Sequence, residues 1–231
     1  MKRFWKEVSV EQADGGWRVL LDGRAIKTQG GAPQIVPTQA LGTAMAEEWQ
    51  RQGEEVDPRD FPLRGLADYA IDQVRSDRTG TIDAILPFAQ TDTLCYRADP
   101  EEPLYRHQQE IWEPLVAACE TGHGLKLERV SGIIHKPQSD AAMARFREVL
   151  EAQDDFALAA LHTLASLAAS LVVALALLDE DADVDSLFAA ANAEEDWQAE
   201  LWGWDHEAEK ARDLKLKAFR TSAQFLELSR T

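Results

Sequence analysis

Hydrophobic and polar residues alternate along the first 37 positions of the chain, a pattern that predicts short β-strands. Residues 17–21 continue this pattern after the turn sequence Asp14-Gly15-Gly16, and further turns are expected at Asp22-Gly23 and Gly30-Gly31. Asp-Gly and Gly-Gly pairs supply the positive φ angles that tight hairpins require. We therefore expect a small antiparallel meander in this part of the chain.

Apolar residues then recur at helical spacing over about residues 38–52, where Thr38 is a suitable N-cap and Gly53 ends the pattern. Helices are also predicted over 63–75 and about 80–88, whereas residues 91–96 have the pattern of an extended segment. A helix over 104–120 contains Pro114, which should kink or restart it. Residues 125–134 alternate again, which indicates a further β segment.

From Ser139 onward the pattern is helical throughout, over about residues 139–152, 155–178, 183–203 and 204–228. Together these elements predict the α+β class. We expect a small β-rich antiparallel N-terminal domain with one helix, residues 1–60, followed by a larger, mainly α-helical domain over residues 61–231.

One helical segment has two interpretations. Residues 156–178 carry no formal charge and include eight Leu and eight Ala, so they are long enough to cross a bilayer. His162 and two serines interrupt the apolar character, and no Lys or Arg cluster flanks the segment to orient it. A buried central helix is the interpretation that these features favour over a membrane span.

Composition narrows the class of protein. The chain has 231 residues, of which 45% are hydrophobic, and a formal net charge of −17, which disfavours binding to nucleic acid or to anionic membranes. The two cysteines, Cys95 and Cys119, form no C-x-x-C pair, so a reducing compartment is expected. No secretory signal follows Met1, and we expect a cytoplasmic protein.

The negative charge is concentrated near the C-terminus. Residues 179–209 contain twelve acids and no Lys or Arg, whereas residues 210–231 contain six bases and two acids. The acidic stretch is either a solvated face paired with the basic helix or part of a binding surface. Trp197, Trp202 and Trp204 lie among these acids, and exposed Trp beside carboxylates is typical of protein-binding surfaces.

Sequence signatures of catalysis are missing. The chain has no G-x-S-x-G, Walker A, G-x-G-x-x-G or H-E-x-x-H motif, and no set of metal ligands can be recognised. Asp92, between two threonines, is either a catalytic carboxylate or the closing residue of a local turn. A small-molecule enzyme would need a polar site around Asp92, His107 or His206, and a general protein-binding scaffold is a further alternative.

Several runs carry a resemblance to a known family. They are spread in order over about residues 4–203: Phe4-Trp5-Lys6, Leu21-Asp22-Gly23-Arg24 with Lys27-Thr28, Glu48-Trp49, Pro62-Leu63, Thr91-Asp92-Thr93-Leu94-Cys95-Tyr96-Arg97, Gln109 with Trp112 and Pro114, and Glu195 with Gln198 and Trp202-Gly203. With these runs the chain resembles the ATP synthase assembly factor 2 family. The residues after Trp202-Gly203 depart from the mitochondrial pattern, which leaves open whether Asp205, Glu207 or neither replaces the family's acid.

The resemblance implies a chaperone without a cofactor and without a catalytic reaction. Its members bind the unassembled α subunit of F-type ATP synthase, shield the surface that later meets the β subunit, and are released on assembly. On this resemblance we expect a monomeric, cytoplasmic alphaproteobacterial member without a transit peptide. The candidate client-binding residues are Trp202, Trp204, Glu195 and Glu200, then Asp205 and Glu207, with Trp49 and Asp92 as weaker candidates.

Overall fold

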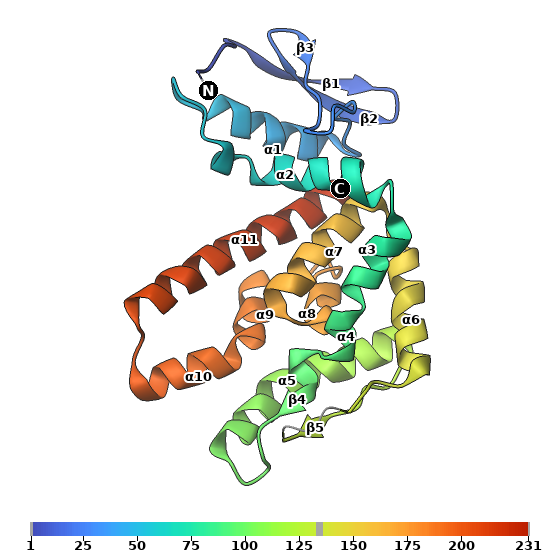
Figure 1. Ribbon diagram of the computed structural model, residues 1–231, viewed down its shortest axis with the longest axis vertical. Helices are drawn as coiled ribbons and strands as arrows, with labels where there is room; N and C mark the ends of the chain where they lie inside the picture. Colours follow the sequence, from blue (N-terminus) through green and yellow to red (C-terminus); the bar gives the residue numbers. More distant parts are fainter. Residues whose placement is uncertain (1, 133–135, 231) are drawn as a thin grey trace. The chain divides into compact units, whose positions relative to one another are not determined.

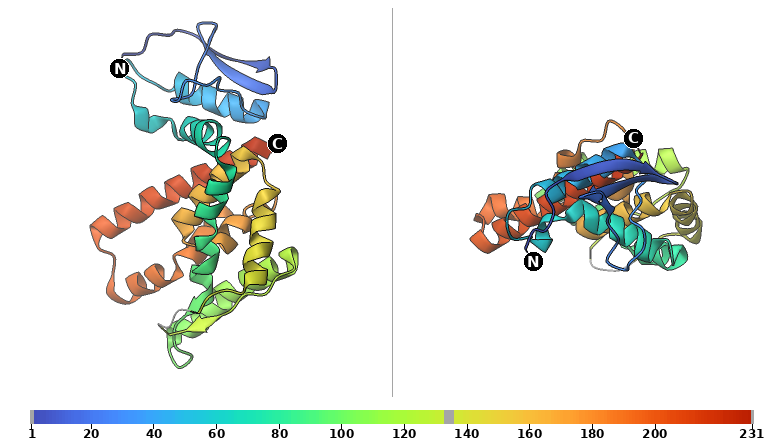
Figure 2. Two further views of the ribbon diagram at one scale, coloured as in Figure 1. Left: turned by 45° about the vertical axis from the view of Figure 1, so that its right-hand side comes forward. Right: turned by 90° about the horizontal axis from the view of Figure 1, so that it is seen from above.

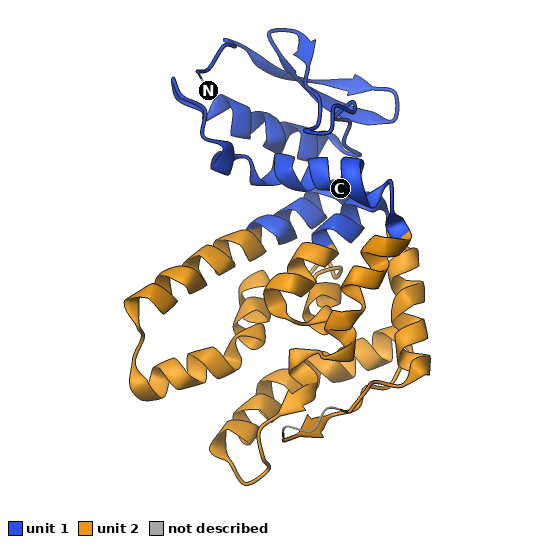
Figure 3. Ribbon diagram, viewed as in Figure 1, with its two compact units in different colours: residues 1–78, 154–160, 221–231 blue, residues 79–153, 161–220 orange. Residues whose placement is uncertain are grey.

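The computed structural model describes residues 2–132 and 136–230, in which a small antiparallel sheet precedes a mostly helical chain (Figure 1). This arrangement confirms the expected α+β class. Contacts divide the chain into two compact units (Figure 3): unit 1 contains residues 1–78, 154–160 and 221–231, and unit 2 contains residues 79–153 and 161–220. The expected domain boundary at residue 60 stays a prediction.

The sheet of unit 1 is the predicted meander. Strands β1 (Val8–Ala13), β2 (Gly16–Leu21) and β3 (Arg24–Ala25) pair antiparallel in that order, with Val8 opposite Leu21. Asp22 and Gly23 both have positive φ, 49° and 74°, as a two-residue hairpin between β2 and β3 requires. The turn residues of the sequence thus set the register of the sheet.

Helix α1 (Gln39–Gln50) packs on strands β1 and β2, as the views in Figures 1 and 2 both show. The Thr38 hydroxyl caps it by accepting a hydrogen bond from Leu41 N at 3.1 Å. Buried Glu48 on α1 accepts hydrogen bonds from Leu63 N and Arg64 N, at 2.7 and 3.0 Å. Those two amides begin helix α2 (Pro62–Tyr69), so α1 supplies the cap of its neighbour.

Two carboxylates fasten the loop after β3 to the next helical segment. Helix α2 continues into a π-helical turn, Ala70–Val74, which was not anticipated from the sequence. Asp72 of this turn accepts hydrogen bonds from the Thr28 hydroxyl at 2.7 Å and from Gly30 N at 2.8 Å. Asp68 accepts one from Gln29 N at 3.2 Å. The loop is therefore held by charge-assisted bonds.

All of helix α3 (Arg78–Ile85) except its first residue belongs to unit 2, and the short helix α4 (Pro87–Gln90) follows it. The expected extended segment over 91–96 is wrong in its first part, because Thr93–Cys95 forms a 3₁₀ helix. The Asp92 carboxylate accepts a hydrogen bond from Leu94 N at 3.0 Å and so caps this turn. Only Tyr96–Arg97 is extended, as strand β4, and it pairs parallel with β5 (Val130–Ser131).

Strand β5 bears out part of the β segment expected over residues 125–134; Ile133 and Ile134 of that segment lie outside the described residues. Helix α5 (Pro103–His123) passes through Pro114 without the restart that the sequence suggested. The proline removes one backbone donor, but the helix is anchored nearby, since fully buried Trp112 donates its indole N–H to Ala190 O at 2.7 Å. Helix α6 (Asp140–Glu151) then begins after the cap Ser139, as expected.

Two expected long helices are each broken into two, and these expectations were wrong. Helix α7 (Asp155–Ala168) ends just before Ala169, whose φ is +49°, and α8 (Leu171–Ala176) follows. The Ser170 hydroxyl caps α8 by accepting from Val173 N at 3.1 Å. The second break lies at Asn192, between α9 (Val184–Ala191) and α10 (Ala193–Trp202). Helix α11 (His206–Arg230) covers the last predicted helix.

The apolar segment 156–178 is buried in the structure, as the first of its two interpretations expected. Leu158, Leu161, Leu164 and Leu171 have no exposed surface. None of the helices within the described residues combines the length and the apolar character that crossing a membrane would take.

Candidate protein-binding surface

The acidic stretch covers the segment before α9, α9 itself, α10 and the start of α11, and part of it is neutralised within unit 2. Arg220 of α11 pairs with Asp185 of α9 through two contacts of 2.7 Å and lowers the pKa of that carboxyl. Arg212 likewise holds Asp196 of α10 through contacts of 2.7 and 2.5 Å. The basic helix thus pairs with the acidic ones, as one of the two interpretations of the sequence expected.

Other acids of the stretch are left without such a partner. Among the described residues, no Lys or Arg forms an ion pair with Glu195, Glu200, Asp205 or Glu207. Asp205 instead accepts a hydrogen bond from Glu207 N at 2.8 Å and so caps the start of α11. The unpaired carboxylates leave a negative field available to a partner.

A groove of about 500 Å³ lies where α10 turns into α11. Helix α10 contributes Glu195, Gln198, Ala199 and Trp202, whose spacing of three, four and seven residues places them on one helical face. The turn and α11 complete the lining with Gly203, Trp204, Asp205, Ala208, Ala211, Arg212 and Lys215. The residues from α11 were missed by sequence reasoning, although the helical spacing on α10 was a usable signal for Gln198 and Ala199.

Glycine is required at the turn that shapes this groove. Gly203 ends α10 with φ 83° and ψ 159°, a backbone conformation that residues with a Cβ rarely adopt. The chain reverses there, so that the tryptophans on both sides of the glycine line one groove. Gly203 therefore gives the run Trp202-Gly203-Trp204 its geometry.

The two groove tryptophans are exposed to different degrees. Trp202 exposes 78% of its surface and Trp204 43%, and the Arg212 guanidinium lies 5.5 Å from the Trp204 ring centre. Leu201 and Leu214 are also exposed on the same two helices. Exposed large apolar side chains gathered in one region are a common feature of interaction surfaces, so this region is a candidate for one. Trp197, in contrast, packs against the His107 ring at 5.0 Å.

The sequence-predicted residues are only partly brought together. Glu195, Trp202, Trp204 and Asp205 line the groove, whereas exposed Glu200 and Glu207 lie on its helices but outside its lining. Trp49 is buried in unit 1, where its ring contacts Trp5 and Phe61 at 4.9 and 4.6 Å and lies under Arg64.

Asp92 has no exposed surface and serves as a double cap. Its carboxylate accepts hydrogen bonds from Leu94 N at 3.0 Å and from Val172 N at 2.9 Å, at the starts of the 3₁₀ helix and of α8. Burial raises its pKa to about 6, against the opposing effect of these hydrogen bonds and that of Ser170. Of the two sequence interpretations, the structure places Asp92 as the residue that closes a local turn.

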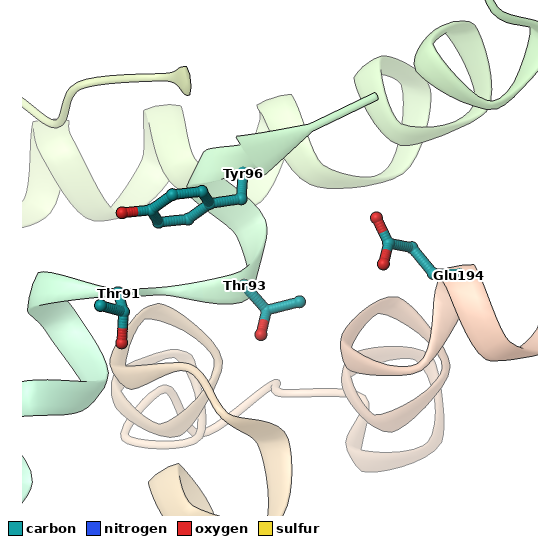
Figure 4. A pocket seen from close by; sticks show the side chains of 4 residues that line it. All are labelled: Thr91, Thr93, Tyr96 and Glu194. Atoms are coloured by element: carbon teal, nitrogen blue, oxygen red, sulfur yellow. The ribbon is translucent and has the colours of Figure 1, made fainter. Parts of the chain in front are cut away.

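The remaining titratable groups do not form a metal site in the described part of the chain, which contains no cluster of three potential ligands. Burial raises the pKa of both the Cys95 and the Cys119 thiol to about 12. A smaller hollow of about 380 Å³ lies elsewhere in unit 2, lined by Thr91, Thr93, Tyr96 and Glu194 (Figure 4). Sequence reasoning did not single out this hollow.

Comparison with known proteins gives consistent matches. Residues 2–120 match the family described as the ATP12 chaperone protein. The mitochondrial protein atp12 of Schizosaccharomyces pombe is 27% identical over 237 aligned residues, which cover 97% of this chain and 81% of that protein. The crystal structure of Atp12 from Paracoccus denitrificans is 38% identical with a TM-score of 0.93 and covers 99% of this chain and 98% of that one. A protein of Agrobacterium tumefaciens is 36% identical with a TM-score of 0.93, covering 98% and 85%.

Proposed function

The chain belongs to the ATP12 chaperone family and serves in ATP synthase assembly, and from this premise we propose that its client is the unassembled α subunit of the F-type ATP synthase. The chaperone covers the α-subunit surface that later meets the β subunit. An orphan subunit exposes an apolar interface that would otherwise aggregate. A partner that binds this interface keeps the subunit soluble by mass action.

The observation that carries the proposal is the groove between α10 and α11. It combines a tryptophan that is 78% exposed with carboxylates that lack an ion-pair partner among the described residues. Tryptophan supplies large anchor area at protein interfaces, and rim carboxylates select partners of complementary charge. We assign client binding to Trp202 and Trp204, with Glu195 and Asp205 at the rim.

Release follows from competition between two interfaces. The mature contact with the β subunit displaces the chaperone if it is larger and better matched than the chaperone contact. No chemical step is needed for this exchange, so we expect a non-catalytic binding partner, and we keep the monomeric state as part of the proposal. Since its solved relatives come from alphaproteobacteria, we place it in the bacterial cytoplasm.

The test is a holding assay with purified α subunit. The wild-type protein should suppress light scattering by α subunit diluted from denaturant, and a pull-down from lysate should recover free α subunit. Trp202→Ala should weaken binding by more than about 2 kcal/mol, or roughly 30-fold, because a central aromatic anchor is lost. Folding should be unaffected, since the side chain lies mostly in water.

Phe4→Ala is the matched control, because Phe4 is also a large exposed aromatic, at 69%, but lies in unit 1 outside the groove. It should hold the α subunit as well as the wild type does. Equal holding by Trp202→Ala and the wild type would contradict the assignment of the groove. Recovery of assembled enzyme alone would support a general scaffold instead of a chaperone for the free subunit.

A further inference from the structure

A second candidate recognition pocket lies at the N-terminal end of α10, where Glu194 precedes the groove residue Glu195. The hollow lined by Thr91, Thr93, Tyr96 and Glu194 adjoins another of about 360 Å³ that shares Tyr96 and Glu194. In Figure 4 the Glu194 side chain reaches from α10 toward the facing segment that carries Thr93 and Tyr96. We call this hollow the Tyr96–Glu194 pocket.

Glu194 is a half-buried carboxylate without a cation. Gln108, which is fully buried, donates its side-chain amide to one Glu194 oxygen at 2.6 Å, and in turn accepts from Ala98 N at 2.8 Å. Burial raises the pKa of Glu194, and the hydrogen bond from Gln108 opposes this. No Lys or Arg of the described chain pairs with it. A carboxylate removed from water is normally matched by a cation.

The facing wall suits the stem of a long side chain. Tyr96 offers a half-buried ring, and the Thr91 and Thr93 hydroxyls donate to Pro87 O at 3.1 Å and Ala169 O at 2.9 Å. Because the protons of both hydroxyls are engaged, the oxygens present lone pairs, which accept hydrogen bonds from a donor. An aromatic face and nearby acceptors favour a side chain with a methylene stem and a cationic end.

The neighbouring charges also favour a cation. Asp99 and Glu102 are exposed in the wall of the adjoining hollow. Arg97 lies in the same wall, but its guanidinium is buried, lies 5.5 Å from the Trp112 ring centre and pairs with Glu113 at 3.2 Å. Glu113 is shared with Arg129, and Arg97 Nη1 has no hydrogen-bond partner among the described residues, but the three acids of the hollow outnumber this one buried cation.

We propose that the Tyr96–Glu194 pocket binds a cationic side chain of the client protein, an arginine or lysine whose stem lies on the Tyr96 ring and whose charged end meets the Glu194 carboxylate. This inference rests on the proposed function, because the cation is supplied by the client. Glu194 lies in the first turn of α10, next to the groove residue Glu195, so a single client segment can reach both the pocket and the groove.

A small probe tests the pocket without the client. Arginine amide added to the labelled full-length protein should shift the NMR signals of Tyr96 and Glu194. Citrulline amide, which keeps the stem and the α-amino group but ends in a neutral ureido group, should shift them much less. Glu194→Gln should reduce arginine amide binding about tenfold, since a charge-assisted contact is lost. The variant keeps an oxygen that accepts the hydrogen bond from Gln108, so the fold is preserved.

The binding assay with the α subunit uses Glu194→Gln, and Glu180→Gln is its control. Glu180 is an exposed acid of the acidic stretch and lies on the segment before α9. Glu194→Gln should bind the α subunit about tenfold more weakly and with less salt dependence, and the control should match the wild type. Equal NMR shifts with both amides would overturn the proposal that the pocket binds a cation. So would a Glu194→Gln variant that binds both arginine amide and the α subunit as tightly as the wild type does. If the wild type fails to hold the α subunit, the proposed function fails, whereas Glu194-dependent arginine amide binding still supports a cation pocket.

Discussion

Replacing Asp92 by asparagine should change how the stability of the protein depends on pH. Asp92 is fully buried and caps two segments, through Leu94 N at 3.0 Å and Val172 N at 2.9 Å. Asn keeps one oxygen that accepts a hydrogen bond but places an amide donor where the second carboxylate oxygen lies. Asn also cannot ionise, so the variant isolates the effect of the charge.

The magnitude follows from the pKa. Burial raises the pKa of Asp92 from its ordinary value of 3.8 to about 6. The folded protein therefore binds the Asp92 proton more tightly than the unfolded chain, and this stability is present below the ordinary pKa and lost as pH rises through about 6. A difference of this size corresponds to ~3 kcal/mol in full. Roughly 1 to 2 kcal/mol of it falls between about pH 5 and about pH 8.

Urea unfolding of the wild type and Asp92→Asn across this range measures the effect. The difference between the two free energies of unfolding cancels contributions from other carboxyls, because both proteins contain them. On going from about pH 8 to about pH 5, the wild type should gain roughly 1 to 2 kcal/mol relative to the variant. At neutral pH the net effect of the substitution should be small, because relief of the buried charge offsets the lost hydrogen bond.

Asp183→Asn is the control, since Asp183 also caps a helix, through Asp185 N at 3.1 Å and Ser186 N at 3.2 Å, but is fully exposed. The Ser186 hydroxyl and the backbone amides lower the pKa of Asp183, so the stability that ionised Asp183 contributes should be lost as pH falls. This pH dependence is opposite in sign to that of Asp92. The reasoning would be refuted if the difference in free energy of unfolding between the wild type and Asp92→Asn stayed the same from about pH 5 to about pH 8. It would also be refuted by a wild type that gains stability over that variant as pH rises.

Two further predictions concern packing. Gly30→Ala should destabilise unit 1 by about 1–3 kcal/mol, because the new Cβ would lie 2.8 Å from the Asp72 carboxylate and disturb its bond to the loop. Gly53→Ala, which meets nothing within 4 Å, should unfold in urea like the wild type, and equal midpoints for both variants would contradict the clash. Ellman's reagent should react with neither Cys95 nor Cys119 in the native protein and with both after unfolding, because burial raises both thiol pKa values to about 12. Rapid reaction of either thiol in the native protein would contradict this burial.

Part of the fold could be predicted because its signals are local. Asp22-Gly23 adopts the positive φ angles that its residue types favour, and the Thr38 and Ser139 hydroxyls cap helices that begin at the next residue. These interactions involve atoms within a few residues of one another, so the sequence alone specifies them. The apolar composition of residues 156–178 is likewise visible in the sequence alone. It indicated a buried segment, and the structure buries most of these residues.

The breaks within the long helices could not be predicted in the same way. Ser170 caps α8 locally, but the second partner of this helix start is Asp92, which is 80 residues away in the chain. The carboxylate competes for backbone donors that a continuous helix would otherwise use. The sequence pattern over 155–178 stays helical on both sides of Ala169, and it therefore indicated one helix where the structure has two.

The sequence by itself determined the kinds of residue that form the candidate surface, since the acids and the tryptophans of α10 and the following turn are close together in the chain. The tertiary structure decided which of them act together. Arg212 and Arg220 neutralise Asp196 and Asp185, whereas Glu195 is left to the groove. Pairing across helices depends on side-chain positions set by packing, and the charge pattern of a single sequence does not contain that information.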